Sequence, residues 1–159
     1  MATVYILIGK IASGKTTWAL ERKKKSPLVL LSCDDMMLNL FNGCLGEKHS
    51  ETERRCLMFL FGQAAQLADL GMDAVLDSGF WTKESRKMAK AYFTDRGIKT
   101  RLYFFDIPDE IRLDRLEKRN ELLARSTQRS FIIDKKLMEN LDKKFEAPLP
   151  NEYDFIVCD

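Results

Sequence analysis

The chain has 159 residues, the length of one domain, with 45% hydrophobic and 31% charged residues and a formal net charge of +2. These values are those of a soluble globular protein. The small net charge excludes a global field that recruits nucleic acid or membrane, although it leaves room for a local basic site. No apolar run approaches the ~20 residues of a membrane helix, and we expect no signal peptide. Four cysteines without a CxxC pair or a histidine at zinc spacing indicate reduced thiols, so we expect a cytoplasmic protein without membrane contact.

Apolar strand patterns alternate with helical patterns along the whole chain. Five strands are expected, at residues 4–8, 28–32, 74–77, 100–105 and 154–158. Helices are expected at residues 14–25, 35–42, 50–71, 82–97, from 108 onward, and 134–145. The helix at 50–71 is expected to open with a capping box of Ser50 and Glu53. Strands separated by helices pair in parallel through right-handed crossovers, so the sequence predicts a three-layer α/β fold in a single domain, residues 1–159.

Residues 9–16 read Gly-Lys-Ile-Ala-Ser-Gly-Lys-Thr and match the P-loop pattern Gly-x-x-x-x-Gly-Lys-Thr between a buried strand and a helix. The two glycines let the loop wrap closely, so that its N–H groups point at phosphate oxygens, and the helix presents its positive end to the same anion. Lys15 is expected to reach the β- and γ-phosphates and Thr16 to ligate Mg²⁺. The sequence therefore predicts a site for ATP and Mg²⁺. The candidate nucleotide-binding residues in it are Gly9, Ala12, Ser13, Gly14, Lys15, Thr16 and Thr17.

Acidic residues follow two of the expected strands. Asp77 ends a short strand, where it would complete the Mg²⁺ site with Thr16; the alternative is a cap for the turn before Gly79. Asp34 and Asp35 follow the second strand, at the carboxyl edge of the sheet where ligand sites form. Either could accept the proton of an acceptor hydroxyl, or cap the helix at 35–42. We interpret Asp34 as the general base and Asp35 as the cap.

Arg115 and Arg119 lie four residues apart on one face of an expected helix, and a polar stretch with Arg125 and Arg129 follows. Arginine forks stabilise the oxygens of a transferring phosphoryl group. This pattern predicts a lid over about residues 119–133, with Arg119 and Arg115 as catalytic candidates beside Lys15 and Asp34. The alternative is a solvated helix surface, because residues of both charges lie nearby.

The ordered set of motifs resembles a known family. It consists of residues 9–17, Asp34, Asp77-Ser78-Gly79-Phe80-Trp81, Phe105-Asp106-Ile107-Pro108 and Arg115-x-x-x-Arg119-Asn120. It is similar to the small AAA-domain P-loop kinases, relatives of the kinase half of phage polynucleotide kinases, chloramphenicol phosphotransferases and zeta toxins. The resemblance covers almost the whole chain, up to the loop at 145–148.

The resemblance implies a nucleoside-kinase-like fold with a five-stranded parallel sheet in the order 2-3-1-4-5. That order sets the strand ending at Asp77 beside the P-loop strand. The resemblance also implies that Asp34 is the general base, that Arg119 contacts the phosphates, and that the loop at 145–148 packs near the nucleotide base.

One residue departs from the polynucleotide kinases. Those enzymes carry an arginine three residues after the base, where it holds a substrate phosphate, and this chain has Met37 there. A methionine cannot bind an anion, so Met37 favours an apolar acceptor pocket over the end of a nucleic acid.

Three functions fit the sequence. The first is an ATP-dependent phosphotransferase with a small-molecule hydroxyl acceptor, and the second is a 5′-hydroxyl polynucleotide kinase acting on a nucleic-acid 5′ end. The third, from a different class, is a nucleotide-dependent switch or ATP-binding regulatory module that has no acceptor. The sequence leaves open the acceptor, the choice between ATP and GTP, the oligomeric state, and whether Asp34 or Asp35 is the base.

Overall fold

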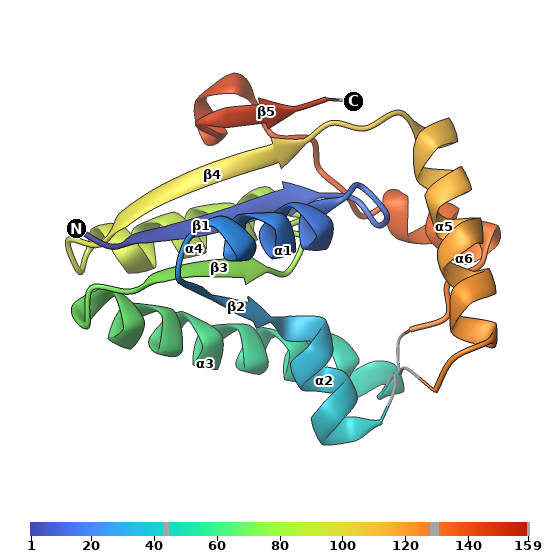
Figure 1. Cartoon of the computed structure of the whole chain (residues 1–159), viewed down its shortest axis with the longest axis horizontal. Helices are drawn as coiled ribbons and strands as arrows, with labels where there is room; N and C mark the ends of the chain where they lie inside the picture. Colours follow the sequence, from blue (N-terminus) through green and yellow to red (C-terminus); the bar gives the residue numbers. More distant parts are fainter. Residues whose placement is uncertain (43–44, 128–130, 159) are drawn as a thin grey trace.

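Five parallel strands form one sheet in the order β2-β3-β1-β4-β5 in the computed structural model, which describes residues 1–42, 45–127 and 131–158 (Figure 1). The strands are β1 (Thr3–Gly9), β2 (Leu28–Ser32), β3 (Asp73–Asp77), β4 (Lys99–Phe105) and β5 (Phe155–Val157). The expected sheet order is therefore confirmed, and so is the three-layer α/β class. All seven residues of β1 are buried, because this strand lies between β3 and β4 and under helices on both faces.

Helices cover both faces of the sheet and extend past its carboxyl edge (Figure 1). The α-helices are α1 (Lys15–Lys25), α2 (Cys33–Phe41), α3 (His49–Asp69), α4 (Lys83–Thr94), α5 (Asp109–Ala124) and α6 (Lys135–Asp142). Two 3₁₀ turns, η1 (Gly46–Lys48) and η2 (Pro150–Glu152), precede α3 and β5. Helices α5 and α6 stand beyond the carboxyl ends of the strands. None of the helices in the described ranges is long and apolar enough to span a membrane.

The side chains of β1 alternate between two hydrophobic cores. Ile6 and its neighbours two residues away face the core that contains Phe61 of α3 and Phe93 of α4. Tyr5 and Leu7 face the other core, under α1. Each fully buried aliphatic side chain of this strand contributes about 1.5–3 kcal/mol to stability. Since β1 is fixed from both faces, the loop that leaves its carboxyl end starts from a rigid point.

Two helix starts differ from the sequence expectation. The N-cap of α2 is Ser32, whose hydroxyl accepts a hydrogen bond from the Asp35 amide at 3.2 Å. Asp34 and Asp35 therefore lie in the first turn, and the interpretation of Asp35 as the cap was wrong because Ser32 already fills that role. The capping box at Ser50 is also not formed. Helix α3 begins at His49, directly after η1, so Ser50 lies inside the helix.

The cap of α2 gives a stability prediction. Replacing Ser32 by Ala leaves the Asp35 amide without its acceptor, so we expect Ser32→Ala to lower the free energy of unfolding by about 1 kcal/mol. Ser50→Ala is the matched control and should change it by less than about 0.5 kcal/mol. Chemical denaturation of the three proteins measures both values. Equal losses in the two variants would contradict the assignment of the cap.

Candidate functional site

The P-loop leaves the carboxyl end of β1 and runs directly into α1. Ala12 and Gly14 both have left-handed backbones, with φ of 59° and 90°. A side chain on Gly9 would meet the Ser13 hydroxyl at 2.8 Å and the Phe105 Cβ at 3.1 Å, so only glycine fits there. The loop is thus a closely wound run of backbone at a helix N-terminus, which is the geometry of a phosphate cradle.

The Lys15 side chain is folded back across this loop. Its ammonium group donates hydrogen bonds to the carbonyl oxygens of Gly9 at 3.0 Å and Lys10 at 2.8 Å, and to the Ser13 hydroxyl at 3.2 Å. Burial lowers the pKa of Lys15 to about 8, although the nearby Asp77 carboxylate acts in the opposite direction. The direct hydrogen-bond partners of this ammonium group are neutral oxygens, and the carboxylates of Asp77 and Asp34 act on it through their charge, so it can exchange these partners for phosphate oxygens.

Thr16 and Asp77 meet beside the cradle. The Thr16 hydroxyl donates to a carboxylate oxygen of Asp77 at 2.5 Å, and Asp77 is buried at the end of β3, which pairs with β1. One hydroxyl and one carboxylate fit the way proteins hold Mg²⁺ on a triphosphate, because that ion keeps several waters and takes phosphate oxygens for its other positions. In the described ranges no cluster of three or more metal-binding side chains competes with this pair.

Asp34 lies in the first turn of α2, at the end of the strand next to β3. Ser32, the last residue of β2, pairs with Asp77, so the two strand ends bring Asp34 toward the cradle. The residue keeps an exposed surface, but the protein around its carboxyl group displaces much of the water. That burial, followed by the repulsion of Glu53 and Asp77, raises the pKa of Asp34 to about 6. A carboxylate with this pKa is suited to general-base chemistry near neutral pH.

The two arginines predicted on α5 both face the P-loop side. Arg119 is half-buried and donates to the Phe131 carbonyl at 3.1 Å, and burial lowers its pKa while Asp34 opposes the change. A side chain on Gly14 would meet a terminal nitrogen of Arg115 at 3.3 Å, so the Arg115 guanidinium lies over the end of the loop. The structure therefore brings Arg115, Arg119, Asp34 and the P-loop to one edge of the sheet. Residues 128–130 of the expected lid, Arg129 among them, lie outside the described residues.

The sequence missed a second set of contacts, from the segment after β3. The Gly9 amide donates to the Gly79 carbonyl at 3.0 Å, and the Trp81 indole donates to the Gly9 carbonyl at 3.2 Å. The buried Arg86 of α4 fixes this segment by donating to the carbonyls of Phe80 and Trp81. Only the position of Trp81 close after Asp77 hinted at such a role. Nothing in the spacing of α4 indicates that Arg86 is buried.

Met37 does not line an acceptor pocket. It is 1% exposed and packs in the core between α2 and α3, where the Cys56 thiol contacts its sulfur atom at 3.5 Å. Cys33 and Met37 lie four residues apart on the face of α2 that turns inward, so both are buried. The expectation that Met37 contributes to an apolar acceptor pocket is therefore wrong.

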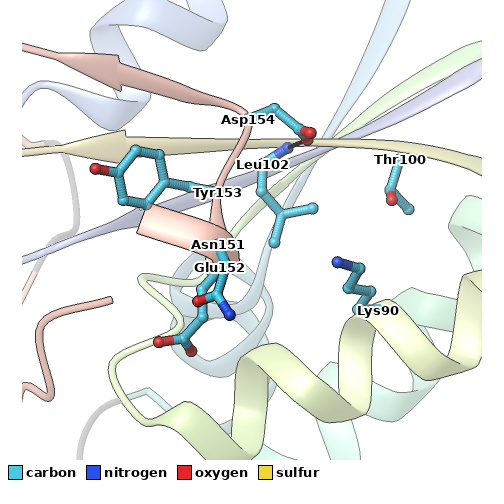
Figure 2. Close-up of a pocket in the computed structure, with 7 residues that line it drawn as sticks. All are labelled: Lys90, Thr100, Leu102, Asn151, Glu152, Tyr153 and Asp154. Atoms are coloured by element: carbon cyan, nitrogen blue, oxygen red, sulfur yellow. Dashed lines mark hydrogen bonds between the residues drawn. The ribbon is translucent and has the colours of Figure 1, made fainter. Parts of the chain in front are cut away.

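A small cavity of about 80 Å³ lies at the other end of the sheet and does not belong to this site (Figure 2). Lys90 reaches into it from α4, and Thr100 and Leu102 line it from β4. Thr100 pairs with Val4, five residues before Gly9 on β1. At about 3.3 Å per residue, the part of the cavity at Thr100 is roughly 17 Å from the start of the P-loop.

Comparisons with known proteins agree with this geometry. A family model described as an AAA domain matches residues 4–148. The chain belongs to this AAA domain family. The resemblance to small AAA-domain P-loop kinases is thereby confirmed, and the fold is that of the P-loop kinases. A search of the curated proteins found no match.

Several solved structures share the fold at low sequence identity. A candidate kinase from Chloroflexus aurantiacus J-10-fl is 19% identical with a TM-score of 0.72, covering 99% of this chain and 84% of that one. The Mycobacterium tuberculosis APS kinase CysC, solved with AMPPNP and APS, is 24% identical with a TM-score of 0.68, covering 99% and 88%. A chain of the Pnkp1/Rnl/Hen1 RNA repair complex is 21% identical with a TM-score of 0.71, covering 90% of this chain and 43% of that one.

The close winding of the loop gives a binding prediction. Gly9→Ala forces the Ser13 hydroxyl or Phe105 to move, so we expect MgATP to bind about tenfold more weakly or worse, as measured by isothermal titration calorimetry. Gly62→Ala is the control, because a Cβ there finds only the Tyr92 hydroxyl, at 3.9 Å, inside a helix that favours alanine. Equal affinity in both variants would contradict the close approach at Gly9.

Proposed function

We propose that this chain is an ATP-dependent kinase that transfers the γ-phosphoryl group to a hydroxyl group of a small molecule. The observation that carries the proposal is the carboxyl group of Asp34, whose pKa is raised to about 6 beside a phosphate cradle. Nucleotide binding by itself needs no such group. A carboxylate with a near-neutral pKa at this position is suited to take the proton of an attacking hydroxyl group.

Binding of the triphosphate would use the P-loop amides and Lys15. The Lys15 ammonium would exchange its bonds to the Gly9 and Lys10 carbonyls for bonds to phosphate oxygens, which are stronger because both partners are charged. Thr16 and Asp77 would hold Mg²⁺, which when bound neutralises charge on the phosphates. For this to happen, the hydrogen bond that joins the two side chains must open.

The transfer step needs a general base and positively charged side chains that stabilise the transferring phosphoryl group. The acceptor oxygen attacks the γ-phosphorus, its proton passes to the Asp34 carboxylate, and the bond from phosphorus to the bridging oxygen breaks so that ADP leaves. Arg119 and Arg115 would stabilise the negative charge that spreads over the transferring group. In this proposal Arg119, at the start of the expected lid, reaches the nucleotide from α5, and residues 1–159 act as one kinase domain.

Removing the base gives a direct test. Asp34→Asn keeps the shape of the side chain but cannot take a proton, so we expect phosphoryl transfer to fall by about 100-fold or more with MgATP affinity nearly unchanged. Asp35→Asn is the matched control, because that side chain lies exposed on the same turn. Turnover with γ-labelled ATP measures the first quantity and calorimetry the second. Undiminished turnover in Asp34→Asn would remove this residue from its proposed role.

The two shifted pKa values predict a bell-shaped pH profile. Protonation of Asp34 should lower kcat/KM for the acceptor below pH about 6, with a slope that approaches tenfold per pH unit. Loss of the Lys15 proton should lower kcat/KM for ATP above pH about 8. The residual activity of Asp34→Asn should lack the acid limb, and an acid limb that persists in that variant would assign the pKa to another group.

The acceptor is found by a screen with γ-labelled ATP. We expect transfer to a compound among nucleosides, sugars, and aminoglycoside or phenicol alcohols. A 5′-hydroxyl oligonucleotide in the same screen tests the polynucleotide-kinase alternative, and labelling of it alone would replace the small-molecule proposal. Slow hydrolysis with no labelled acceptor and an unaltered rate in Asp34→Asn would favour a nucleotide-dependent switch instead.

A further inference from the structure

Arg112 is a fully buried cation on the first turns of α5, with no solvent exposure at all. Its Nε donates to the carbonyl oxygen of Ile11, in the P-loop, at 3.0 Å. Its two terminal nitrogens donate to the Asp142 carboxylate of α6 at 2.8 Å, and one of them also donates to Asp109 at 3.0 Å. One guanidinium therefore joins the P-loop to both helices that stand over the carboxyl edge of the sheet.

A purely structural role does not explain why this position is an arginine. A buried guanidinium loses its hydration, and replacing a buried ion pair by apolar side chains of similar volume is often neutral or stabilising. An apolar pair of similar volume at positions 112 and 142 could fill the same space. The bond to Asp109 could be replaced by water, because that side chain is 70% exposed. The hydrogen bond from Nε to the loop carbonyl has no such substitute.

That hydrogen bond fixes the orientation of one peptide plane. In a planar trans peptide the C=O and the next N–H point in opposite directions, so holding the Ile11 oxygen toward Arg112 turns the Ala12 N–H away from it. Ala12 also has a left-handed φ of 59°, which is unfavourable for a residue with a side chain and persists only where its surroundings hold it. The two preceding carbonyls, of Gly9 and Lys10, point instead to Lys15.

We propose that Arg112 is a positioning residue for nucleotide binding, which holds the Ile11–Ala12 peptide so that the Ala12 N–H serves the phosphate cradle and which ties that peptide to α6 through Asp142. The inference rests on the proposed function only in its first step, the binding of MgATP. Arg112 touches neither the nucleotide nor the acceptor in this role. Its effect is therefore expected in ATP affinity and not in the transfer step.

Two double variants isolate the single hydrogen bond. In Arg112→Gln with Asp142→Leu, the glutamine Nε2 occupies the chain position of the arginine Nε and can still donate to Ile11. In Arg112→Met with Asp142→Leu, a methyl group stands in the same place and donates nothing. Both proteins lack the same ion pair, so their stabilities should be similar. We expect the methionine protein to bind MgATP roughly fivefold to tenfold more weakly than the glutamine protein, with kcat unchanged between the two.

Calorimetric titration with MgATP and a thermal unfolding curve of each protein decide the outcome. Equal affinities of the two double variants, with wild type binding normally, would overturn the inference and leave the proposed function standing. A wild-type protein that does not bind MgATP would overturn both. An NMR spectrum of the wild-type protein gives a test that does not depend on the folding of a variant. The backbone amide resonance of Ala12 should shift when MgATP binds. An unchanged resonance would also overturn the inference.

Discussion

The burial of β1 on both faces is the constraint on which the rest of the molecule depends. Seven consecutive buried residues, paired with β3 on one side and β4 on the other, fix the point where the P-loop begins. Because the strands are parallel, their carboxyl ends and the residues that follow them meet at one edge. The end of β3 supplies Asp77, the turn after β2 supplies Asp34, and α5 follows the end of β4. Weakening the pairing of β1 would move every one of these groups at once.

Two buried arginines, one on α4 and one on α5, support the P-loop. Arg86 fixes the segment after β3, which in turn binds both polar groups of Gly9. Arg112 binds the Ile11 carbonyl and the carboxylate of Asp142. A guanidinium suits these positions because it offers several donors in a rigid plane and can satisfy carbonyls and carboxylates together. The loop is therefore shaped before any nucleotide arrives, which lowers the ordering cost of binding.

The electrostatics of the site work against the stability of the fold. Asp34 has a raised pKa in the folded chain, so the folded state favours its protonated form. The stability from this group is present below the pKa of the unfolded carboxyl and is lost as the pH rises through about 6. At neutral pH the ionised carboxylate is therefore a destabilising element, held close to Glu53 and Asp77. A loss of folding stability of this kind is common at functional sites.

The sequence by itself determined the order of elements, the P-loop, and the candidate roles of Asp34, Asp77 and Arg119, because each depends on short spacings or on a strand end. The strand order came from the family resemblance, since local patterns do not encode which strands are neighbours. Tertiary structure alone decided the rest. Ser32 and not Asp35 caps α2, because α2 begins at Cys33, directly after the last residue of β2. Met37 is buried because α3 covers the face of α2 on which it lies. Arg86 and Arg112 look like ordinary residues of charged helices. Only packing shows that Arg86 also pairs with Glu152, 66 residues further along the chain, and that Arg112 reaches the Ile11 carbonyl, 101 residues before it.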